Sequence, residues 1–417
     1  MMDFARSTDP AVQAQLDRLP ALSPAGDRLG LERIAALLDR LGRPQDQLPP
    51  VFHVAGTNGK GSTCAFLRAA IEASGRTVHA FTSPHLVRFN ERIRIAGRLI
   101  EDEQLASLLR EVLDASEGIE PSFFEVATAV ALLAFARTPA DACILEVGLG
   151  GRLDATNIID RPVVCAISSL GLDHQHFLGT TIASIAAEKA GIAKRGVPLV
   201  SLAQPPEAQA AIVAAAEAAG AALLLEGRDW DADPSFASSL PGAHQHRNAS
   251  LAWQMLEAQD SFHVSEAQFR SGIAKANWPA RLQRLAPGPL TGNRELWLDG
   301  GHNPSAAHEI ADWVRAASKD GKPLHLLFAS LATKDPEGML QPFAGFVSQV
   351  HCVPIPDHDC FAPDVLAQMA TGLGFRADAS ESFGEALTAV PDDARVLIFG
   401  SLYLAGAVLA ANNQPPD

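Results

Sequence analysis

The nine residues Val-Ala-Gly-Thr-Asn-Gly-Lys-Gly-Ser at positions 54–62 constrain this chain more than any other feature. An apolar run at residues 51–55 precedes the glycines and is expected to form a strand, and residues 62–74 are expected to form a helix. In that context glycines let backbone amides surround phosphate oxygens, and the helix N-terminus adds a positive partial charge. Lys60 would add a full charge and Ser62 a hydroxyl ligand for magnesium. The pattern therefore predicts a phosphate loop, formed by Gly56, Thr57, Asn58, Gly59, Lys60, Gly61 and Ser62.

This loop departs from the common spelling G-x-x-x-x-G-K-[ST], because Gly61 separates Lys60 from Ser62. The alternative is an ordinary turn between a strand and a helix. Such a turn would use Gly and Asn but would need neither the lysine nor the serine. We therefore prefer the phosphate loop.

The chain around this loop alternates apolar runs with helical stretches, which is typical of βαβ units in a mostly parallel sheet. Further strands are expected at residues 77–82, 142–147 and 163–168, and helices at residues 104–116, 124–136 and 182–190. The expected fold class is α/β. It comprises an N-terminal phosphate-loop ATPase domain with a mostly parallel sheet and a smaller C-terminal Rossmann-like α/β domain.

A stretch rich in Pro and Gly, residues 285–293, interrupts this rhythm and is the best candidate for a linker. Beyond it, strand-like runs at residues 295–298, 324–329, 350–355 and 396–399 alternate with helical stretches. We expect a catalytic, ATP-binding domain over residues 1–285, a linker over residues 286–293 and a second domain over residues 294–417. An alanine-rich helix is also expected at residues 208–222.

Composition excludes several classes of function. The 417 residues carry a formal net charge of −15, which gives no electrostatic footprint for nucleic acid or anionic lipid. The longest apolar run, residues 126–136, is well short of the ~20 residues that a membrane-spanning helix needs, and we expect a buried helix there. The five cysteines are scattered without a Cys-x-x-Cys pair, and the first ten residues lack the apolar core of a signal peptide. A cytoplasmic protein with reduced thiols fits these features best.

An acidic residue ends one of the predicted strands, at the sheet edge where open α/β folds place their ligands. Glu146 could hold a metal on ATP there, or it could be a plain acid at a strand end. The glycines that follow it, Gly148, Gly150 and Gly151, lack the third glycine and the helix spacing of a dinucleotide fingerprint. We therefore favour the metal ligand.

Other polar residues leave two interpretations open. His174 follows the strand at residues 163–168 and is a plausible ligand, although a loop histidine is more often a surface group, as we expect for His176. Lys189 lies near the end of a predicted helix, where a solvated cation is the ordinary interpretation. Asp299 and His302 follow the strand at residues 295–298 and could be turn formers only.

Taken together and in this order, the motifs resemble those of the folylpolyglutamate synthase/dihydrofolate synthase family, relatives of the Mur ligases of cell-wall synthesis. The resemblance spans nearly the whole chain. Its motifs are Gly-Thr-Asn-Gly-Lys-Gly-Ser at 56–62, Thr-Ser-Pro-His-Leu at 82–86, Glu-Val-Gly-Leu-Gly-Gly-Arg-Leu-Asp-Ala-Thr-Asn at 146–157, Asp-His-x-x-x-Leu-Gly at 173–179, Glu-Lys-Ala-Gly-Ile at 188–192, Asp-Gly-x-His-Asn-Pro at 299–304 and Gly-Ser-Leu-Tyr at 400–403.

The resemblance implies two magnesium sites. Ser62, Ser83 and Glu146 would hold one Mg²⁺, and His174 and Lys189 would hold a second, with Glu146 shared. In this family the matching lysine is commonly carbamylated by CO₂, which would turn Lys189 from a repelling cation into an anionic ligand. The catalytic set implied in this way is Lys60, Glu146, His174 and Lys189.

The resemblance also implies the binding residues. Lys60 and the loop amides would bind the phosphates of ATP, and Asn248, Arg281 and Asp299 would complete the nucleotide site at the domain junction. The folate side of the site would be formed by Thr82, Ser83, Pro84, His85, Phe124, Arg152, Asp154 and Ala155. His302 and Ser401 would contact glutamate or phosphate. The family's Gly-Ala-His-Asn reads Gly-Gly-His-Asn at residues 300–303, and we expect this change to leave function intact.

The activity implied is that of an ATP-dependent acid–amino-acid ligase. A substrate carboxylate would attack the γ-phosphate of ATP to give an acyl phosphate, from which the amine of L-glutamate would displace phosphate. Dihydropteroate and tetrahydrofolate would be the acceptors, and monomers are usual for the family. Two alternatives remain: a Mur-type amide ligase acting on a cell-wall precursor, and a phosphate-loop nucleotide-binding regulator that ligates nothing. The motif at residues 82–86 speaks against the first, and the second leaves Glu146, His174 and Lys189 unexplained.

Overall fold

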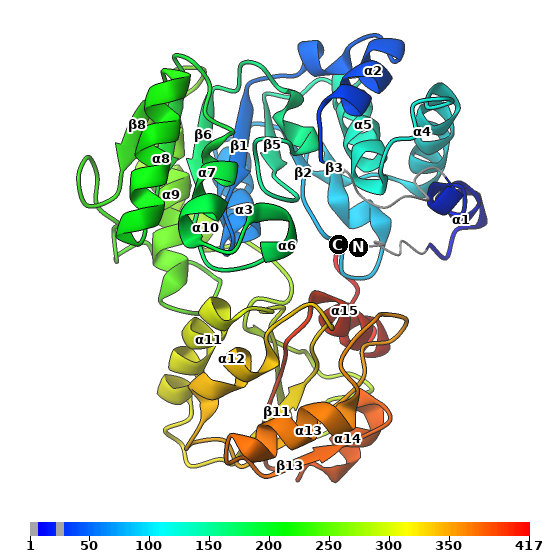
Figure 1. Ribbon diagram of the computed structural model, residues 1–417, viewed down its shortest axis with the longest axis vertical. Helices are drawn as coiled ribbons and strands as arrows, with labels where there is room; N and C mark the ends of the chain where they lie inside the picture. Colours follow the sequence, from blue (N-terminus) through cyan, green and yellow to red (C-terminus); the bar gives the residue numbers. More distant parts are fainter. Residues whose placement is uncertain (1–6, 22–28) are drawn as a thin grey trace. The chain divides into compact units, whose positions relative to one another are not determined.

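The structure, a computed structural model, describes residues 7–21 and 29–417. Within these residues the chain divides into two compact units (Figure 1). The first contains the described residues up to Ser239 together with His246–Ala276, and the second contains Leu240–Gln245 together with Asn277–Asp417. Each unit has its own sheet, and both sheets are mostly parallel, which confirms the predicted fold class.

The first unit is built on a sheet that has eight strands in the described part of the chain, in the order β4-β3-β2-β5-β1-β6-β7-β8. These strands are β1 (Val51–Ala55), β2 (Val78–Phe81), β3 (Ile93–Ile95), β4 (Arg98–Leu99), β5 (Ala142–Glu146), β6 (Val164–Ile167), β7 (Pro198–Ser201) and β8 (Ala222–Leu225). Neighbours from β2 to β8 pair in parallel, while β3 pairs antiparallel with both β2 and β4.

The position of β1 between β5 and β6 determines where a ligand can bind. Val54 pairs with Glu146 of β5, and Ala55 pairs with Ile167 of β6, so the three strands end at nearly the same level. The segments that follow these strands therefore emerge side by side, at the edge where open α/β sheets bind ligands.

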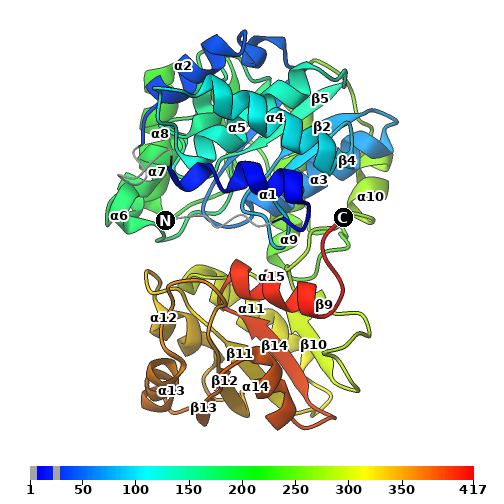
Figure 2. The same ribbon diagram turned by 90° about the vertical axis from the view of Figure 1, so that its right-hand side faces the viewer.

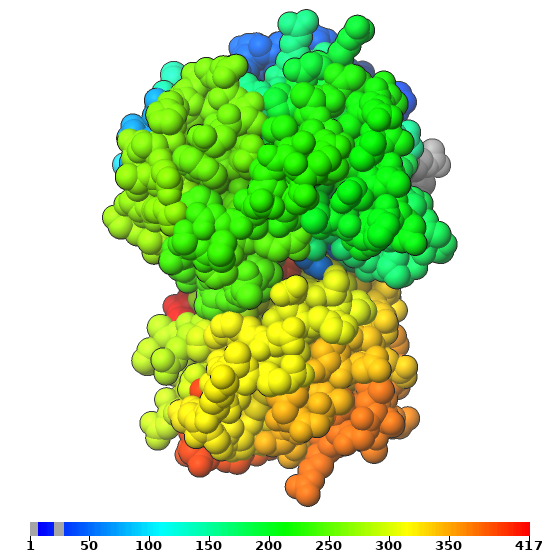
Figure 3. Space-filling model, turned by 90° about the vertical axis from the view of Figure 1, so that its left-hand side faces the viewer, coloured from blue at the N-terminus to red at the C-terminus, as the bar shows by residue number. Residues whose placement is uncertain are grey.

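Helices pack against this sheet so that β1 is buried along its whole length. They are α1 (Pro10–Leu16), α2 (Glu32–Arg40), α3 (Lys60–Ala73), α4 (Asp102–Ala115), α5 (Phe123–Ala136), α6 (Gln175–Leu178), α7 (Ile182–Ala190), α8 (Pro206–Ala219), α9 (His244–Glu257) and α10 (Glu266–Ile273). α3 contacts α10 and the strands β1, β2 and β5, while α5 contacts β2 and β3 and α4 lies beside α5 (Figure 2). In Figure 3 the surface of the first unit that faces the viewer is mostly green, and these segments include α8.

α5 is the apolar run for which a buried helix was predicted, and it is buried over almost its full length. Its N-terminus is fixed by a capping box. Ser122 N donates to Glu125 Oε2 at 2.6 Å, and Glu125 N donates back to Ser122 Oγ at 3.2 Å. Arg33 Nε lies 3.0 Å from the same carboxylate. Across residues 7–21 and 29–417, no helix is long and apolar enough to cross a membrane.

The second unit has a sheet of six strands within the described residues, in the order β13-β12-β11-β14-β10-β9. The strands are β9 (Gln283–Arg284), β10 (Glu295–Leu298), β11 (Leu324–Phe328), β12 (Gln349–Cys352), β13 (Ala377–Ala379) and β14 (Arg395–Phe399). The helices are α11 (Pro304–Ala317), α12 (Pro336–Leu340), α13 (Pro363–Gly372), α14 (Phe383–Ala389) and α15 (Leu402–Ala411). The sheet is parallel except where β9 pairs with β10, and its apolar core lies against α11, α12 and α13.

The division between the units differs from the predicted one. Residues 277–285, expected in the first domain, belong to the second unit, because β9 lies in that stretch and pairs with β10. The predicted linker, residues 286–293, also lies within the second unit. Asn412 holds it there, since Asn412 Nδ2 donates to Ala286 O at 3.1 Å and Leu290 N donates to Asn412 Oδ1 at 3.0 Å. The Pro and Gly residues thus mark a turn before β10 instead of a connection between domains.

Two predicted element ends are also wrong. The helix predicted over residues 208–222 is α8, which ends at Ala219 because Gly220 takes a left-handed conformation with a φ of 70°, and Ala222 already begins β8. The strand predicted over residues 350–355 is β12, which ends at Cys352. Pro354 follows two residues later and has no N–H group to extend the ladder.

Candidate active site

The segment between β1 and α3 turns at two glycines. Gly59 precedes α3 with a φ of 87°, and Gly56 has a φ of 150°. The backbone N–H groups of residues 59–62 have no acceptor among the described residues, as expected for the first turn of a helix. Lys60 Nζ donates to the Thr57 carbonyl at 3.3 Å, so its charge lies over the loop. This geometry can bind the phosphates of a nucleotide.

The loop is fixed by the segment that follows β6. Thr57 N and Asn58 N both donate to Ser169 O, at 2.9 and 3.0 Å. The Ser168 hydroxyl donates to Asn58 O at 2.8 Å, and Thr57 Oγ1 donates to Gly171 O at 3.1 Å. Since the amides of Thr57 and Asn58 are used in this way, the N–H groups that can face a phosphate are those of residues 59–62.

Asn248, on α9, lies against Gly59. A Cβ at Gly59 would come within 3.0 Å of Asn248 Cγ and 3.2 Å of its Nδ2. Asn248 is also buried. The structure therefore brings together two residues that are 189 positions apart in the sequence and were both predicted to contact the nucleotide.

Glu146, the last residue of β5, is buried beside the segment that follows β2. Ser83 N donates to Glu146 Oε2 at 3.2 Å, and the Ser83–Pro84 peptide bond is cis. Ser62 is buried in the first turn of α3. Ser83 and Glu146, predicted to share a metal, are thus in contact.

These oxygen donors fit magnesium, which proteins usually bind through one or two carboxylates together with phosphate oxygens and water. Within the two described ranges, no three His, Cys, Asp or Glu side chains gather into a cluster that could hold a metal. The hydroxyl of Ser62 and the carboxylate of Glu146 are oxygen donors of this kind.

Lys189 comes from α7 and is buried, with Nζ donating to Gly56 O at 2.8 Å. Burial, and next the charge of Lys60, lower the pKa of Lys189 to about 7, while Asp173 and Asp154 oppose this shift. The interpretation of Lys189 as a solvated cation is therefore wrong. A large fraction of this amine is neutral near pH 7.

His174 begins α6 in a left-handed conformation, with a φ of 50°. Its backbone N donates to Asp173 Oδ1 at 2.8 Å, and its ring Nε2 lies 3.9 Å from the same oxygen. The ring is one-third exposed. It follows Gly171, whose carbonyl holds Thr57, so the segment that carries His174 adjoins the phosphate loop.

The glycine-rich segment after β5 packs closely against two other elements. A Cβ at Gly148 would lie within 2.9 Å of the Phe124 ring, and one at Gly151 would lie 2.7 Å from Lys189 O. Arg152 Nη2 donates to Glu188 Oε1 at 2.8 Å, and its guanidinium is more than half exposed. Phe124 and Arg152 were both predicted to contact substrate. Phe124 packs against Gly148 of this segment, and Arg152 follows Gly151, which packs against the backbone of Lys189.

Asp154 is fully engaged by its own loop. Its carboxylate accepts hydrogen bonds from Leu149 N at 2.8 Å, Thr156 N at 3.0 Å and Thr156 Oγ1 at 2.5 Å. Burial raises the pKa of Asp154, and these donors oppose the shift. Asp154 also precedes the 3-10 turn Ala155–Ile158, in which Ala155 is buried. A substrate contact by Asp154 or Ala155 stays a prediction.

Thr156 connects Asp154 to β1. Its hydroxyl donates its one proton to Asp154, so it accepts from His53 Nε2, 2.8 Å away. Burial lowers the pKa of His53 to about 3, so this ring is neutral. His53 Nδ1 is buried and has no hydrogen-bond partner in the described part of the protein. The motif-based prediction did not include His53 or Thr156.

The segment after β2 carries the predicted substrate residues Thr82, Pro84 and His85. His85 is buried, and its Nδ1 accepts from Arg92 Nε at 2.8 Å. Thr82 N donates to Arg92 O at 3.0 Å. Arg92 itself is buried, with its guanidinium over the rings of Phe89 and Phe123. Arg92 therefore fixes both ends of this segment.

The remaining predicted residues form a group in the second unit. Asp299 follows β10 and accepts from Leu282 N at 2.8 Å and Gly301 N at 2.7 Å. Burial raises the pKa of Asp299, against an opposing effect of Arg281. A Cβ at Gly300 would lie 2.9 Å from Arg281 Nη1, so the guanidinium lies along the Gly300 backbone.

His302 and Ser401 lie at the neighbouring strand ends. His302 Nδ1 is 2.9 Å from Gly300 O, and Ser401 Oγ caps α15 by accepting from Tyr403 N at 3.1 Å. Gly400 N donates to Gly301 O at 3.0 Å, which joins the end of β14 to the end of β10. Arg281, Asp299, His302 and Ser401 are thus brought to one edge of the second sheet.

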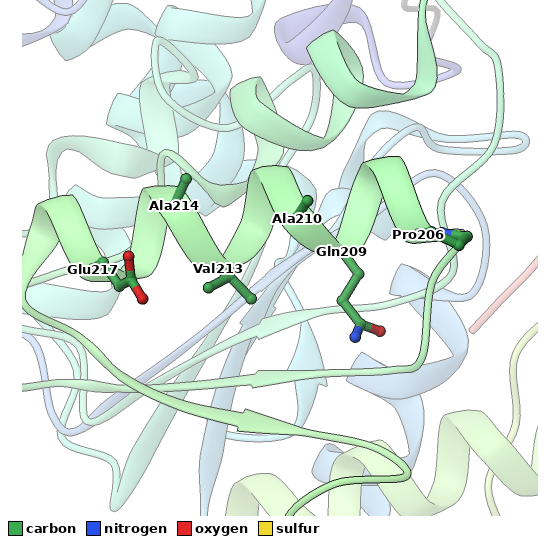
Figure 4. A pocket seen from close by; sticks show the side chains of 6 residues that line it. All are labelled: Pro206, Gln209, Ala210, Val213, Ala214 and Glu217. Atoms are coloured by element: carbon green, nitrogen blue, oxygen red, sulfur yellow. The ribbon is translucent and has the colours of Figure 1, made fainter.

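The structure also has a surface hollow, and none of the site residues described above lines it. It is lined by residues of α8 alone (Figure 4): Pro206, Gln209, Ala210, Val213, Ala214 and Glu217. None of them was predicted to be a site residue, and a hollow formed by one helix offers no converging polar groups.

Comparison with known proteins agrees with the motifs. Residues 289–411 match the family model described as dihydrofolate synthetase, C-terminal domain. The chain is 34% identical over 420 residues to the dihydrofolate synthase/folylpolyglutamate synthase of Bacillus subtilis (strain 168), and the alignment covers 91% of this chain and 94% of that relative.

Solved structures agree over both units. E. coli FolC in complex with DHPP and ADP has a TM-score of 0.86 and 31% identity, with 98% of this chain and 99% of that chain covered. The bifunctional folylpolyglutamate synthase/dihydrofolate synthase from Yersinia pestis, complexed with AMPPNP and Mn ion, has a TM-score of 0.85 and 30% identity, with 98% and 99% covered. The chain therefore belongs to the dihydrofolate synthase/folylpolyglutamate synthase family of ATP-dependent ligases.

Proposed function

We propose that this protein adds L-glutamate both to dihydropteroate, as a dihydrofolate synthase, and to tetrahydrofolate, as a folylpolyglutamate synthase. The observation that carries the proposal is the contact between the Gly59 turn and Asn248, at the start of α3, where Gly61 and Ser62 are buried. The name of the B. subtilis relative and the ligands of the E. coli structure support the folate substrates. No observation favours a Mur-type ligase or a regulator that ligates nothing.

The first chemical step would transfer the γ-phosphoryl group of ATP to a carboxylate oxygen of the pterin substrate. The P–O bond to ADP breaks as the new P–O bond forms, giving an acyl phosphate and ADP. Phosphoryl transfer needs positioning and charge stabilisation more than covalent help. The N–H groups of residues 59–62 and the ammonium of Lys60 would supply both at the phosphates.

The second step would form the amide. The neutral amine of L-glutamate attacks the acyl carbon, the tetrahedral intermediate expels phosphate, and the nitrogen loses a proton. We assign glutamate or phosphate contacts to His302 and Ser401, and nucleotide contacts to Asn248, Arg281 and Asp299. These assignments rest on the matched motifs and, for Arg281, Asp299, His302 and Ser401, on their grouping at one edge of the second sheet.

Two magnesium ions would neutralise charge on the phosphates during transfer. We assign Ser62, Ser83 and Glu146 to one ion and Glu146, His174 and carbamylated Lys189 to the other. The Mn ion in the Y. pestis structure supports the use of a divalent metal by this family. A neutral Lys189 amine is the form that reacts with CO₂, and its pKa of about 7 supports carbamylation.

The folate side would be formed by Thr82, Ser83, Pro84 and His85 after β2, by Phe124 on α5, and by Arg152, Asp154 and Ala155 after β5. Phe124 packs against Gly148, two residues after Glu146, which would place a pterin ring near the acidic strand end. We further propose a monomeric cytoplasmic enzyme. Its five cysteines are all free, which fits a reducing compartment.

The test is an assay of the purified protein with ATP, magnesium and L-glutamate, in parallel with dihydropteroate and with tetrahydrofolate. Phosphate release and the mass of the pterin product are measured. A glutamate-dependent mass gain on both substrates would establish both activities, and a gain on one would restrict the proposal to that one. If neither pterin gains glutamate while ATP still binds, the folate assignment fails.

A further inference from the structure

Gln204, just beyond β7, holds the segment that follows β6 through both ends of its carboxamide. Nε2 donates to Ser168 O at 3.0 Å, and Oε1 accepts from Leu170 N at 3.0 Å. The two bonds together require one orientation of the amide group. A two-point contact of this kind fixes the backbone of Ser168 to Leu170 relative to β7.

The same segment is the support of the phosphate loop. Ser169 lies between the two residues that Gln204 holds, and its carbonyl accepts from both Thr57 N and Asn58 N. The Ser168 hydroxyl donates to Asn58 O at 2.8 Å. Movement of Ser168 to Leu170 would therefore move the first half of the phosphate loop.

Gln204 is itself positioned by an ion pair. Ala203, the preceding residue, donates its N–H to Glu226 Oε2 at 2.7 Å and accepts from Arg247 Nη2 at 3.0 Å. Arg247 also binds Glu226 through Nε–Oε1 at 3.0 Å and Nη2–Oε2 at 2.5 Å. Glu226 is largely buried in this pair.

Arg247 is the neighbour of Asn248 on α9. α9 therefore reaches the phosphate loop twice: directly, where Asn248 packs on Gly59, and through Arg247, Ala203, Gln204 and Ser169, which hold Thr57 and Asn58. The turn at Gly59 lies between these two supports. Preorganised donors bind phosphate well only if such supports hold their orientation.

We propose that Gln204 is a positioning residue for ATP binding, and that the Glu226–Arg247 pair holds Gln204 in place. The proposal rests on the proposed function of the loop as the ATP site. Loss of the carboxamide loosens Ser169 and with it the amides of Thr57 and Asn58. The effect falls on ATP and not on L-glutamate, because the predicted glutamate residues belong to the second unit.

The test compares Gln204→Met with Gln209→Met. Methionine keeps the length and much of the volume of the side chain but makes neither hydrogen bond. Gln209 is a half-buried residue of α8 that lines the surface hollow of Figure 4, and its side chain makes no hydrogen bond to any residue that the structure describes, so it is the matched control. We expect Gln204→Met to raise the KM for ATP about tenfold or more, with the KM for glutamate within about twofold of wild type. Gln209→Met should change neither.

Binding of AMPPNP with magnesium, measured by calorimetry, tests the loop without the ligation reaction. If wild type binds AMPPNP but makes no amide, the proposed function fails and the positioning role is still measured by the loss of affinity in Gln204→Met. If Gln204→Met does not fold, Arg247→Met takes its place, with a smaller expected loss. Affinity within twofold of wild type in the folded variant, or equal changes in the KM for ATP and for glutamate, would overturn the inference.

Discussion

Lys189 Nζ donates a hydrogen bond to the carbonyl oxygen of Gly56, 2.8 Å away. Gly56 is the first residue after β1 and begins the phosphate loop. Because burial and the charge of Lys60 lower the pKa of this amine to about 7, roughly half of it is neutral at pH 7. CO₂ reacts with neutral amines only. We predict a carbamate on Lys189, seen by NMR as a bound carbonyl signal after exposure to ¹³C-bicarbonate.

Lys194→Met is the matched control for this experiment, since burial also lowers the pKa of Lys194, whose Nζ donates to Asn157 O at 3.1 Å. The carbonyl signal should disappear in Lys189→Met and persist in Lys194→Met. Ligase activity should fall with the signal, because an anionic ligand for the metal is lost. A signal that survives in Lys189→Met would show that another amine carries the group.

Gly59→Ala should abolish ATP binding without unfolding the protein. The added Cβ would meet the carboxamide of Asn248 at 3.0 to 3.2 Å or less, at a residue whose φ is 87°. Gly75 has nearly the same φ, 83°, just beyond the end of α3, but a Cβ there meets nothing within 4 Å. Both variants should lose about 1 kcal/mol of stability to backbone strain.

Only the variant at Gly59 should lose ATP affinity, because only its Cβ pushes on the loop and on α9. Titration with AMPPNP and thermal unfolding of both variants separate the two effects. Equal ATP affinity in Gly59→Ala and Gly75→Ala would show that the close approach of Asn248 to residue 59 is not needed for ATP binding.

Local patterns in the sequence were enough to predict the glycine turn between β1 and α3, the strand that ends at Glu146 and the α/β class. Each of these depends on residues that are neighbours in the chain: glycines between a strand and a helix, or an acid at the end of an apolar run. The contact between Ser83 and Glu146 was accessible too, through the matched family motifs.

Contacts that join distant parts of the chain were not predictable in the same way. Gln204 and Arg247 belong to no motif, and their roles depend on how β7, β8 and α9 meet beside β6. The linker was misplaced for a related reason. Pro and Gly indicate a turn, but whether a turn lies within or between units depends on tertiary pairing, here of β9 with β10 and of Asn412 with Ala286.

Thr156→Val should destabilise the first unit although valine has nearly the same shape as threonine. The hydroxyl accepts from His53 Nε2 and donates to Asp154, so its loss leaves a buried imidazole N–H without an acceptor. An unsatisfied buried donor costs about 1–3 kcal/mol. Urea unfolding should show this loss in Thr156→Val and little of it in Thr156→Ser, which keeps the hydroxyl.

The same pair of variants tests whether Asp154 acts on the pterin. Thr156→Val leaves the carboxylate with fewer donors, so the KM for dihydropteroate should rise while the KM for ATP stays near the wild-type value. In Thr156→Ser, which keeps the hydroxyl, the KM for dihydropteroate should stay near the wild-type value. If stability falls in Thr156→Val but the KM for dihydropteroate does not change, Asp154 has a structural role only.

Glu295, on β10, should make the second unit sensitive to acid. Burial by itself would raise the pKa of Glu295, but hydrogen bonds from Arg395, Trp297 and Lys322 outweigh it and lower the pKa to about 2, from an ordinary value of 4.5. The unfolded chain therefore binds more protons than the folded one between these values. The stabilisation is complete above about pH 4.5 and is lost as the pH falls toward 2.

Glu295→Gln removes this charge and should cost roughly 2–3 kcal/mol at pH 7, since Glu295 and Arg395 are both largely buried. At pH 2.5 the difference from wild type should be much smaller, because the carboxyl of the unfolded chain is then protonated and most of the pH-dependent stabilisation is lost. Hydrogen exchange of the β10, β11 and β14 amides reports the stability of the second unit separately from that of the first.

Asp312→Asn is the control. It breaks a pair with Arg315 that is mostly exposed, and it should change stability by less than about 0.5 kcal/mol at either pH. A loss in Glu295→Gln that is the same at both pH values would mean that packing, not charge, sets the contribution of Glu295.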